Sequence, residues 1–186
     1  MQRNKHNTFI NVLTNKVGTQ DYFNLFRDIS NEIGRVSQII PNTIWEAPKE
    51  YKEEMGDDIK SEIWLLGNLS LSEIVQIKRW TMYFEYQYSI NGQRQFNLNP
   101  GYFSLNGMFL LTHKDNNSRG RINLDDGVWQ EKQYTIIGNR FLPNDNTFSE
   151  FLSNDRIVSL NSINPIEALT VPNIAASAAG RCNLQL

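Results

Sequence analysis

The sequence predicts an α+β fold in which a mainly helical N-terminal part (residues 1–78) packs on an antiparallel β-sandwich or barrel (residues 80–160). Three observations lead to this prediction. Apolar residues between positions 19 and 40 recur three and four apart, as in an amphipathic helix. From residue 80 the apolar positions alternate with a period of two. Turn signals then follow at short intervals as far as residue 142, which is typical of an all-β region.

Two helices are predicted at the start of the chain. Thr8 is a suitable N-cap for a short helix that ends at Gly18. The second helix runs from Thr19 to about Ile40, because Pro41 disfavours helical geometry in the residue before it. The apolar stripe of this second helix consists of Tyr22, Phe26, Ile29, Ile33, Val36 and Ile40. A stripe this narrow contacts one other element along its length, either the domain's own sheet or a helix of another subunit.

Weaker signals connect these helices to residue 80. Pro48 can start a charged helical turn that ends at Gly56. Residues 63–66 form an apolar run that is too short to assign by its period. Ser70 or Ser72 is placed to cap a short helix.

The stretch Trp80–Ile90 is predicted to be the long strand around which the sheet is organised. Every even position in it is apolar or aromatic, and the next two residues are Asn91-Gly92, which favour the positive φ angles of a two-residue hairpin turn. Including this stretch, six or seven strands are expected before residue 142, joined as a meander of hairpins. Among them are residues 96–98, 109–113, 128–130 and 140–142, and a break is expected at Asn99-Pro100-Gly101. One helical turn is expected around residues 148–152 and one more strand at residues 157–160.

Residues 161–186 are predicted to be an extended C-terminal arm. They contain Pro165, Pro172 and a run of small residues at 175–180, which cannot build a core by themselves. Such an arm becomes ordered chiefly when it lies against another surface.

Composition narrows the class of protein. The 186 residues suit a single domain, here residues 1–160 followed by the arm. A net charge of −2 gives no reason to expect a nucleic-acid partner. No apolar run reaches the length of a membrane span or of a signal peptide, so we expect synthesis in the cytoplasm and leave the final location unknown. The one cysteine, Cys182, excludes an internal disulfide framework.

Signatures of catalysis and of metal binding are weak. The two histidines, His6 and His113, lack the spacing of zinc ligands. The loop Asp115–Asp126 partly matches a calcium-binding loop, but Arg119 stands where an oxygen ligand belongs, and a polar hairpin loop explains the same residues. Glu85 and Glu131 are the acids that a small hydrolase would use if they came together.

The leading hypothesis is therefore a non-enzymatic structural or assembly subunit of a multi-subunit particle, such as a virion or a phage tail. It would need no cofactor and no metal, and its partners would be other protein subunits in a homo- or hetero-oligomer. The candidate interface residues are Tyr22, Phe26, Ile29, Ile33, Tyr83 and Trp129. The first alternative is a carbohydrate-binding β-sandwich module with a calcium ion in the Asp115 loop. The second is a small hydrolase that uses carboxylates.

Overall fold

The computed structural model describes residues 5–113, 122–125, 127–138 and 140–162. Within these residues the chain forms an eight-stranded antiparallel sheet and five helices, so the predicted α+β class is confirmed. The elements in chain order are β1 (Lys5–Thr14), α1 (Gln20–Glu32), β2 (Gln38–Asn42), α2 (Lys49–Met55), β3 (Lys60–Ser70), α3 (Leu71–Gln87), β4 (Phe96–Ser104), β5 (Gly107–Thr112), β6 (Ile122–Asp125), β7 (Val128–Ile137), β8 (Arg140–Pro143), α4 (Ser149–Leu152) and α5 (Asn154–Ser162).

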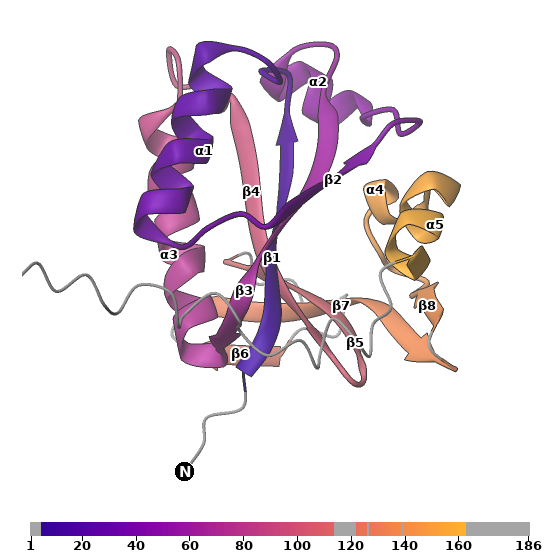
Figure 1. Cartoon of the computed structure of the whole chain (residues 1–186). Coiled ribbons are helices and arrows are strands. Elements are labelled where there is room, and N and C mark those ends of the chain that lie inside the picture. Colours follow the sequence, from indigo (N-terminus) through magenta and orange to yellow (C-terminus); the bar gives the residue numbers. More distant parts are fainter. Residues whose placement is uncertain (1–4, 114–121, 126, 139, 163–186) are drawn as a thin grey trace, which may run out of the picture.

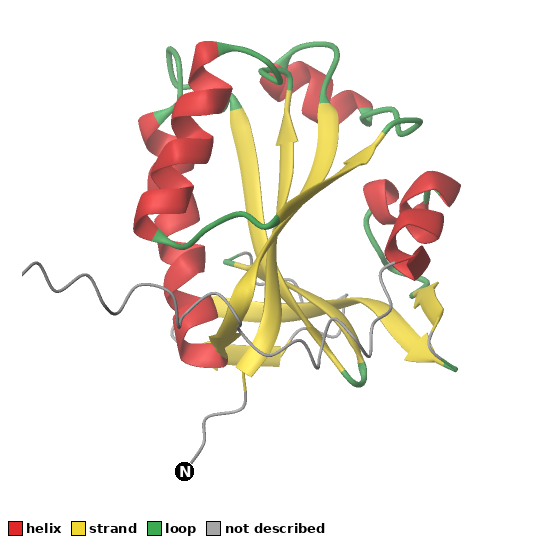
Figure 2. Cartoon of the chain, viewed as in Figure 1, coloured by secondary structure: helices red, strands yellow, loops and turns green. Residues whose placement is uncertain are grey.

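The described strands belong to one sheet, which replaces the predicted sandwich or barrel. Their order is β2-β3-β1-β4-β5-β7-β6, and β8 pairs with β7 beyond this path. Helices α1 and α3 lie side by side on one face of the first half of the sheet (Figure 1). Helices α4 and α5 lie on the other side, near β8 (Figure 2). The N-terminal part predicted to be mainly helical therefore supplies three strands, β1, β2 and β3.

Strand β1 corrects the predicted first helix. Its residues 8–14 are all buried, because β1 lies between β3 and β4 and is covered on both faces. Ile10 and Val12 belong to the core under α1 and α3, whereas Phe9 belongs to the core on the opposite face. A strand that is apolar on both faces has no alternation, so its period does not distinguish it from a buried helix.

The largest error concerns Trp80–Ile90, because residues 71–87 form the helix α3 rather than a strand. Ser70 begins this helix with a capping box: its side chain accepts a hydrogen bond from the Glu73 backbone N–H, and the Glu73 carboxylate accepts one from the Ser70 backbone N–H. The helix buries residues at helical spacing, among them Ile74, Ile77 and Phe84. The alternation of apolar residues from position 80 was therefore coincidental.

Two predicted turns or helix ends are confirmed, the Asn91-Gly92 turn and the end of α2, although the strand predicted before Asn91 is a helix. The Asn91-Gly92 turn has the expected positive φ angles of 52° and 76°, and Ile90 and Gln93 exchange two backbone hydrogen bonds across it. Helix α2 ends at Gly56, as predicted. Helix α1 stops at Glu32 instead of near Ile40, because Gly34 leaves helical geometry with a φ of 153°.

Further differences lie later in the chain. The strand predicted at residues 157–160 is part of helix α5, whose residues Arg156 and Leu160 are buried one turn apart. Helix α5 also takes in residues 161 and 162, the start of the predicted arm. The rest of the arm lies outside the described residues.

Candidate functional site

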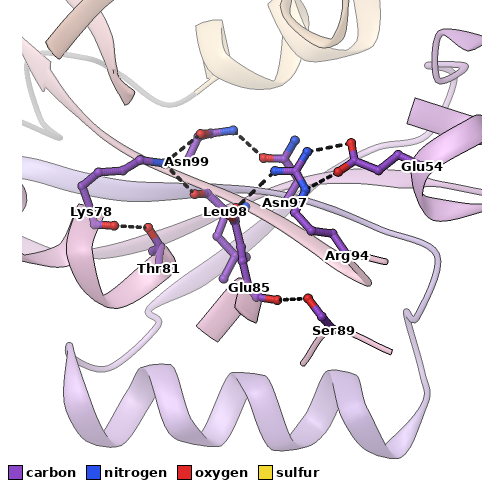
Figure 3. Close-up of polar contacts among 9 residues, drawn as sticks. All are labelled: Glu54, Lys78, Thr81, Glu85, Ser89, Arg94, Asn97, Leu98 and Asn99. Atoms are coloured by element: carbon purple, nitrogen blue, oxygen red, sulfur yellow. Dashed lines mark hydrogen bonds and ion pairs between the residues drawn. The ribbon is translucent and has the colours of Figure 1, made fainter. Parts of the chain in front are cut away.

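Strand β4 has an edge that another strand covers only in part, and the candidate site lies along the uncovered part. Strand β1 pairs with β4 from Phe96 to Tyr102, but β5 pairs only with Gly101–Ser104. The backbone of Leu98 therefore faces helix α3 instead of a strand. The Leu98 N–H donates to Glu85 Oε1 at 2.5 Å, and the Leu98 carbonyl accepts from Lys78 Nζ at 3.3 Å (Figure 3).

Helix α3 positions both charged groups. Lys78, Thr81 and Glu85 are three and four residues apart, so they share the helix face that meets β4. Their exposed fractions are 1%, 0% and 8%. Buried ionisable groups need hydrogen-bond partners. Here the Leu98 N–H and carbonyl, which face α3 instead of a strand, serve as partners for Glu85 and Lys78.

Arg94 connects this pair to helix α2. Its Nε and Nη2 donate to the two carboxylate oxygens of Glu54 at 2.6 and 2.7 Å, which is a bidentate ion pair. This hydrogen bonding raises the pKa of Arg94. Arg94 Nη1 lies 3.7 Å from Glu85 Oε2, an ion-pair distance that is too long for a hydrogen bond.

A chain of amide hydrogen bonds continues from Lys78 across the face of β4. Lys78 Nζ donates to Asn99 Oδ1 at 3.2 Å, and Asn99 Nδ2 donates to Asn97 Oδ1 at 2.8 Å. An ammonium group has no acceptor, so it fixes the orientation of the Asn99 amide, which in turn fixes that of Asn97. The Asn97 amide nitrogen is thereby left as the outward-facing donor.

These residues line a cleft of about 510 Å³ between β4, helix α2, the end of β5 and the start of helix α4. The remaining wall combines hydroxyl, carboxyl, aromatic and apolar groups, contributed by Pro48, Glu50, Tyr51, Thr112, His113, Thr147, Phe148, Ser149 and Glu150. Glu150 is 2% exposed and accepts a hydrogen bond from Asn11 Nδ2 at 3.3 Å. The cleft therefore joins residues from five separate parts of the chain, including Lys78 and Glu85 of α3.

Burial raises the pKa of Glu85 above its ordinary value of 4.5, although Lys78, the Leu98 N–H and Arg94 act in the opposite direction. The folded state therefore holds this proton more tightly than the unfolded chain does. The stability contributed by Glu85 is fully present below pH 4.5 and is lost as the pH rises through the folded-state pKa.

We expect the free energy of unfolding of the wild type, minus that of Glu85→Gln, to decrease as the pH rises above 4.5. The glutamine keeps an oxygen for the Leu98 N–H but does not titrate. Urea unfolding of both proteins at a series of pH values measures the difference. A difference that stays constant or increases with pH would contradict the assignment.

The candidate interface residues from the sequence separate into three groups. Tyr22 and Ile29 are buried in the domain's own core and are not available to a partner. Phe26 and Ile33 are partly buried against the same core. Tyr83 is 54% exposed on α3, and Trp129 is partly exposed on β7.

Helix α3 carries an exposed aromatic face on the side away from the sheet. Its members Trp80, Met82, Tyr83 and Tyr86 are 40%, 39%, 54% and 82% exposed. The Trp80 and Tyr83 rings pack edge to face, with centroids 6.0 Å apart. Trp80, Met82 and Tyr86, which the alternation placed on the apolar face of a strand, are thus at the surface of a helix.

The structure does not bring Glu85 and Glu131 into one cleft. Glu131 lines a separate cavity of about 420 Å³ beside Phe109 and Asn144. The part of the Asp115 loop from residue 115 to 121 lies outside the described residues. Within the described residues no group of three His, Cys, Asp or Glu side chains is arranged to hold a metal ion. None of the described helices is both long and apolar enough to cross a membrane.

Sequence reasoning missed Lys78, Arg94, Asn97 and Asn99 as members of a site. One signal was available, since Ser70 and Glu73 have the spacing of a capping box. A helix that starts there places Lys78 and Glu85 on its apolar face with Ile74 and Ile77. Charged residues on an apolar helix face are candidates for a buried polar site.

The fold and the cleft define this chain as a mixed α+β domain with a charged, amide-lined cleft at the edge of its sheet. A family model described as "Domain of unknown function (DUF4416)" matches residues 4–165, so the chain belongs to this family. Neither the curated proteins nor the solved structures contain a match to the chain.

Proposed function

We propose that the protein is a non-enzymatic assembly subunit that acts through protein–protein contacts, with the aromatic face of α3 as its contact surface. The observation that supports this is the exposure of Trp80, Met82, Tyr83 and Tyr86 together on one helix. Aromatic residues, methionine and arginine are enriched at protein interfaces, and Trp and Tyr are prominent among the residues that contribute most to binding.

A second copy of the same chain is the partner that fits this surface. Among the exposed residues from Gln76 to Gln87, Arg79 is the one with a charged side chain, so two copies can meet there without opposing runs of like charge. A twofold pair of α3 helices is self-complementary, with aromatic side chains facing aromatic side chains. Helix α1, which lies beside α3 (Figure 1), also carries an exposed ring, that of Phe23.

The length of α3 is consistent with such a contact. Seventeen residues extend over about 26 Å of helix axis. A stable interface buries about 800 Å² on each partner, so the α3 face must be joined by other surface of the domain. We therefore expect a dimer of moderate affinity.

Tyr83→Ser combined with Tyr86→Ser is expected to convert the dimer into a monomer without changing the melting temperature, because both side chains are more than half exposed. Size-exclusion chromatography with light scattering measures the mass. A concentration series up to about 1 mM detects association free energies stronger than about 4 kcal/mol.

The matched control is Leu105→Ser, which removes another exposed apolar side chain at the β4–β5 turn. It should remain dimeric. A wild-type monomer at the highest concentration, or a double variant that associates as strongly as the control, would overturn the proposal.

A further inference from the structure

The cleft beside β4 presents a fixed hydrogen-bond donor that no described residue uses. Asn97 is 5% exposed and lines the cleft. Its Oδ1 accepts a hydrogen bond from Asn99 Nδ2, which fixes the orientation of the Asn97 amide and leaves its Nδ2 as the group that faces elsewhere. Among the described residues Nδ2 has no hydrogen-bond partner. Nδ2 is not one of the fully enclosed polar atoms that lack a partner. It is therefore open to the cleft, where a ligand that accepts a hydrogen bond can replace solvent.

Arg94 supplies a second donor to the same space. Glu54 occupies its Nε and Nη2, and this bidentate contact holds the guanidinium plane in one orientation. Nη1 makes the 3.7 Å contact with Glu85, which is too long for a hydrogen bond, so it keeps hydrogen-bonding capacity, and Arg94 lines the cleft. Asn97 and Arg94 are held by their neighbours before any ligand arrives, which lowers the entropic cost of binding.

The charge of the cleft selects against anions. Its lining includes four carboxyl groups, from Glu50, Glu54, Glu85 and Glu150, and two cationic side chains, Lys78 and Arg94. Glu54 already pairs with Arg94, and Lys78 already donates to β4 and Asn99. A phosphate or a carboxylate ligand would find no unbalanced positive charge here.

The mixture of donors, acceptors and rings fits hydroxyl groups. A hydroxyl both donates and accepts, so it can take a hydrogen bond from Asn97 while giving one to a carboxylate. Tyr51 and Phe148 add aromatic rings to the wall, against which the C–H surface of a ligand can pack. The volume of about 510 Å³ lies within the range of small-molecule sites.

We propose that this cleft binds an uncharged, hydroxyl-rich ligand of the mono- or oligosaccharide class, with the Asn97 amide nitrogen and Arg94 as donors. This site is independent of α3 self-association. It also does not involve the Asp115 loop, so binding requires no calcium.

The experiment is calorimetric titration of the full chain with a panel of neutral mono- and disaccharides, with inorganic phosphate and spermidine as anionic and cationic comparators. At least one sugar is expected to bind, with no effect of a calcium chelator, while phosphate and spermidine do not. Asn97→Asp replaces the free donor by an acceptor in the same shape and should weaken sugar binding about tenfold or more.

Asn106→Asp, which makes the same chemical change in the β4–β5 turn, is the control and should bind like the wild type. A second measurement uses the wild type alone and so does not depend on how well Asn97→Asp folds. Bound sugar should slow the amide hydrogen exchange of residues 94–99. No binding by any sugar, binding of phosphate or spermidine instead, unchanged affinity in Asn97→Asp, or protection elsewhere would each overturn the proposal.

Discussion

Replacing Gly101 by alanine should lower the free energy of unfolding by about 3 kcal/mol or more, because the new methyl group has no space. A Cβ built at Gly101 would lie 2.2 Å from the Phe109 carbonyl oxygen and 2.4 Å from the ring of Phe9. The carbonyl oxygen belongs to the neighbouring strand β5, so relief requires the sheet to move. Urea unfolding monitored by circular dichroism measures the effect.

Gly67→Ala in β3 is the matched control. A Cβ at Gly67 meets nothing within 4 Å, so the change should alter stability by less than about 1 kcal/mol. If Gly101→Ala were no more destabilising than Gly67→Ala, the close approach of β5 and Phe9 to this glycine would be wrong.

Lys78→Met should destabilise the fold by about 3 kcal/mol or more, because it removes one partner of a buried charged pair. Lys78 is 1% exposed, and its ammonium group serves the Leu98 carbonyl, Asn99 Oδ1 and the nearby Glu85 carboxylate. Methionine keeps most of the side-chain volume, so the decrease in the free energy of unfolding comes from the lost polar contacts rather than from a cavity. Chemical unfolding at neutral pH measures it.

Lys52→Met on the exposed side of α2 is the control and should change stability by less than about 0.5 kcal/mol. A double-mutant cycle with Glu85→Gln should give a coupling energy of about 1–3 kcal/mol. Strictly additive effects would show that Lys78 and Glu85 do not stabilise each other.

Local chemistry was sufficient for much of the second half of the chain. Residues 96–98, 109–112, 128–130 and 140–142 were expected in strands and lie in strands, because hairpins join neighbours in sequence and their turn residues are specific. The expected break at Asn99-Pro100-Gly101 does not occur. Pro100 is tolerated inside β4 because backbone groups two residues apart in a strand point to the same side. The nitrogen of Pro100 therefore points, like that of Leu98, to the edge that no strand covers, where no N–H is needed for pairing.

The first half could not be predicted in the same way, because its strands pair across long stretches of chain. β1 pairs with β3 and β4, which lie more than 45 residues further along the sequence. The strand β2 was hidden inside a helical pattern, and its edge position tolerates Pro41. Which residues are buried there depends on the sheet order, which no local pattern encodes.

The candidate site likewise depends on long-range contacts that local sequence patterns do not show. Glu85 attracted notice as a lone strand carboxylate, whereas the structure places it on a helix with Lys78 and opposite Arg94. Glu54, Asn97 and Glu150 come from elements spread over almost a hundred residues. A cleft of this kind exists only once the edge of β4 is left uncovered by β5.

By itself, the sequence determined the mixed α+β class, the hairpin turns and the capped start of α3, since each depends on interactions among residues close together in the chain. Tertiary structure alone decided that residues 80–87 are helical, that β1 lies at the centre of the sheet and that six polar side chains meet beside β4. These depend on long-range pairing and burial, in which the same apolar residue can face either the core or the solvent.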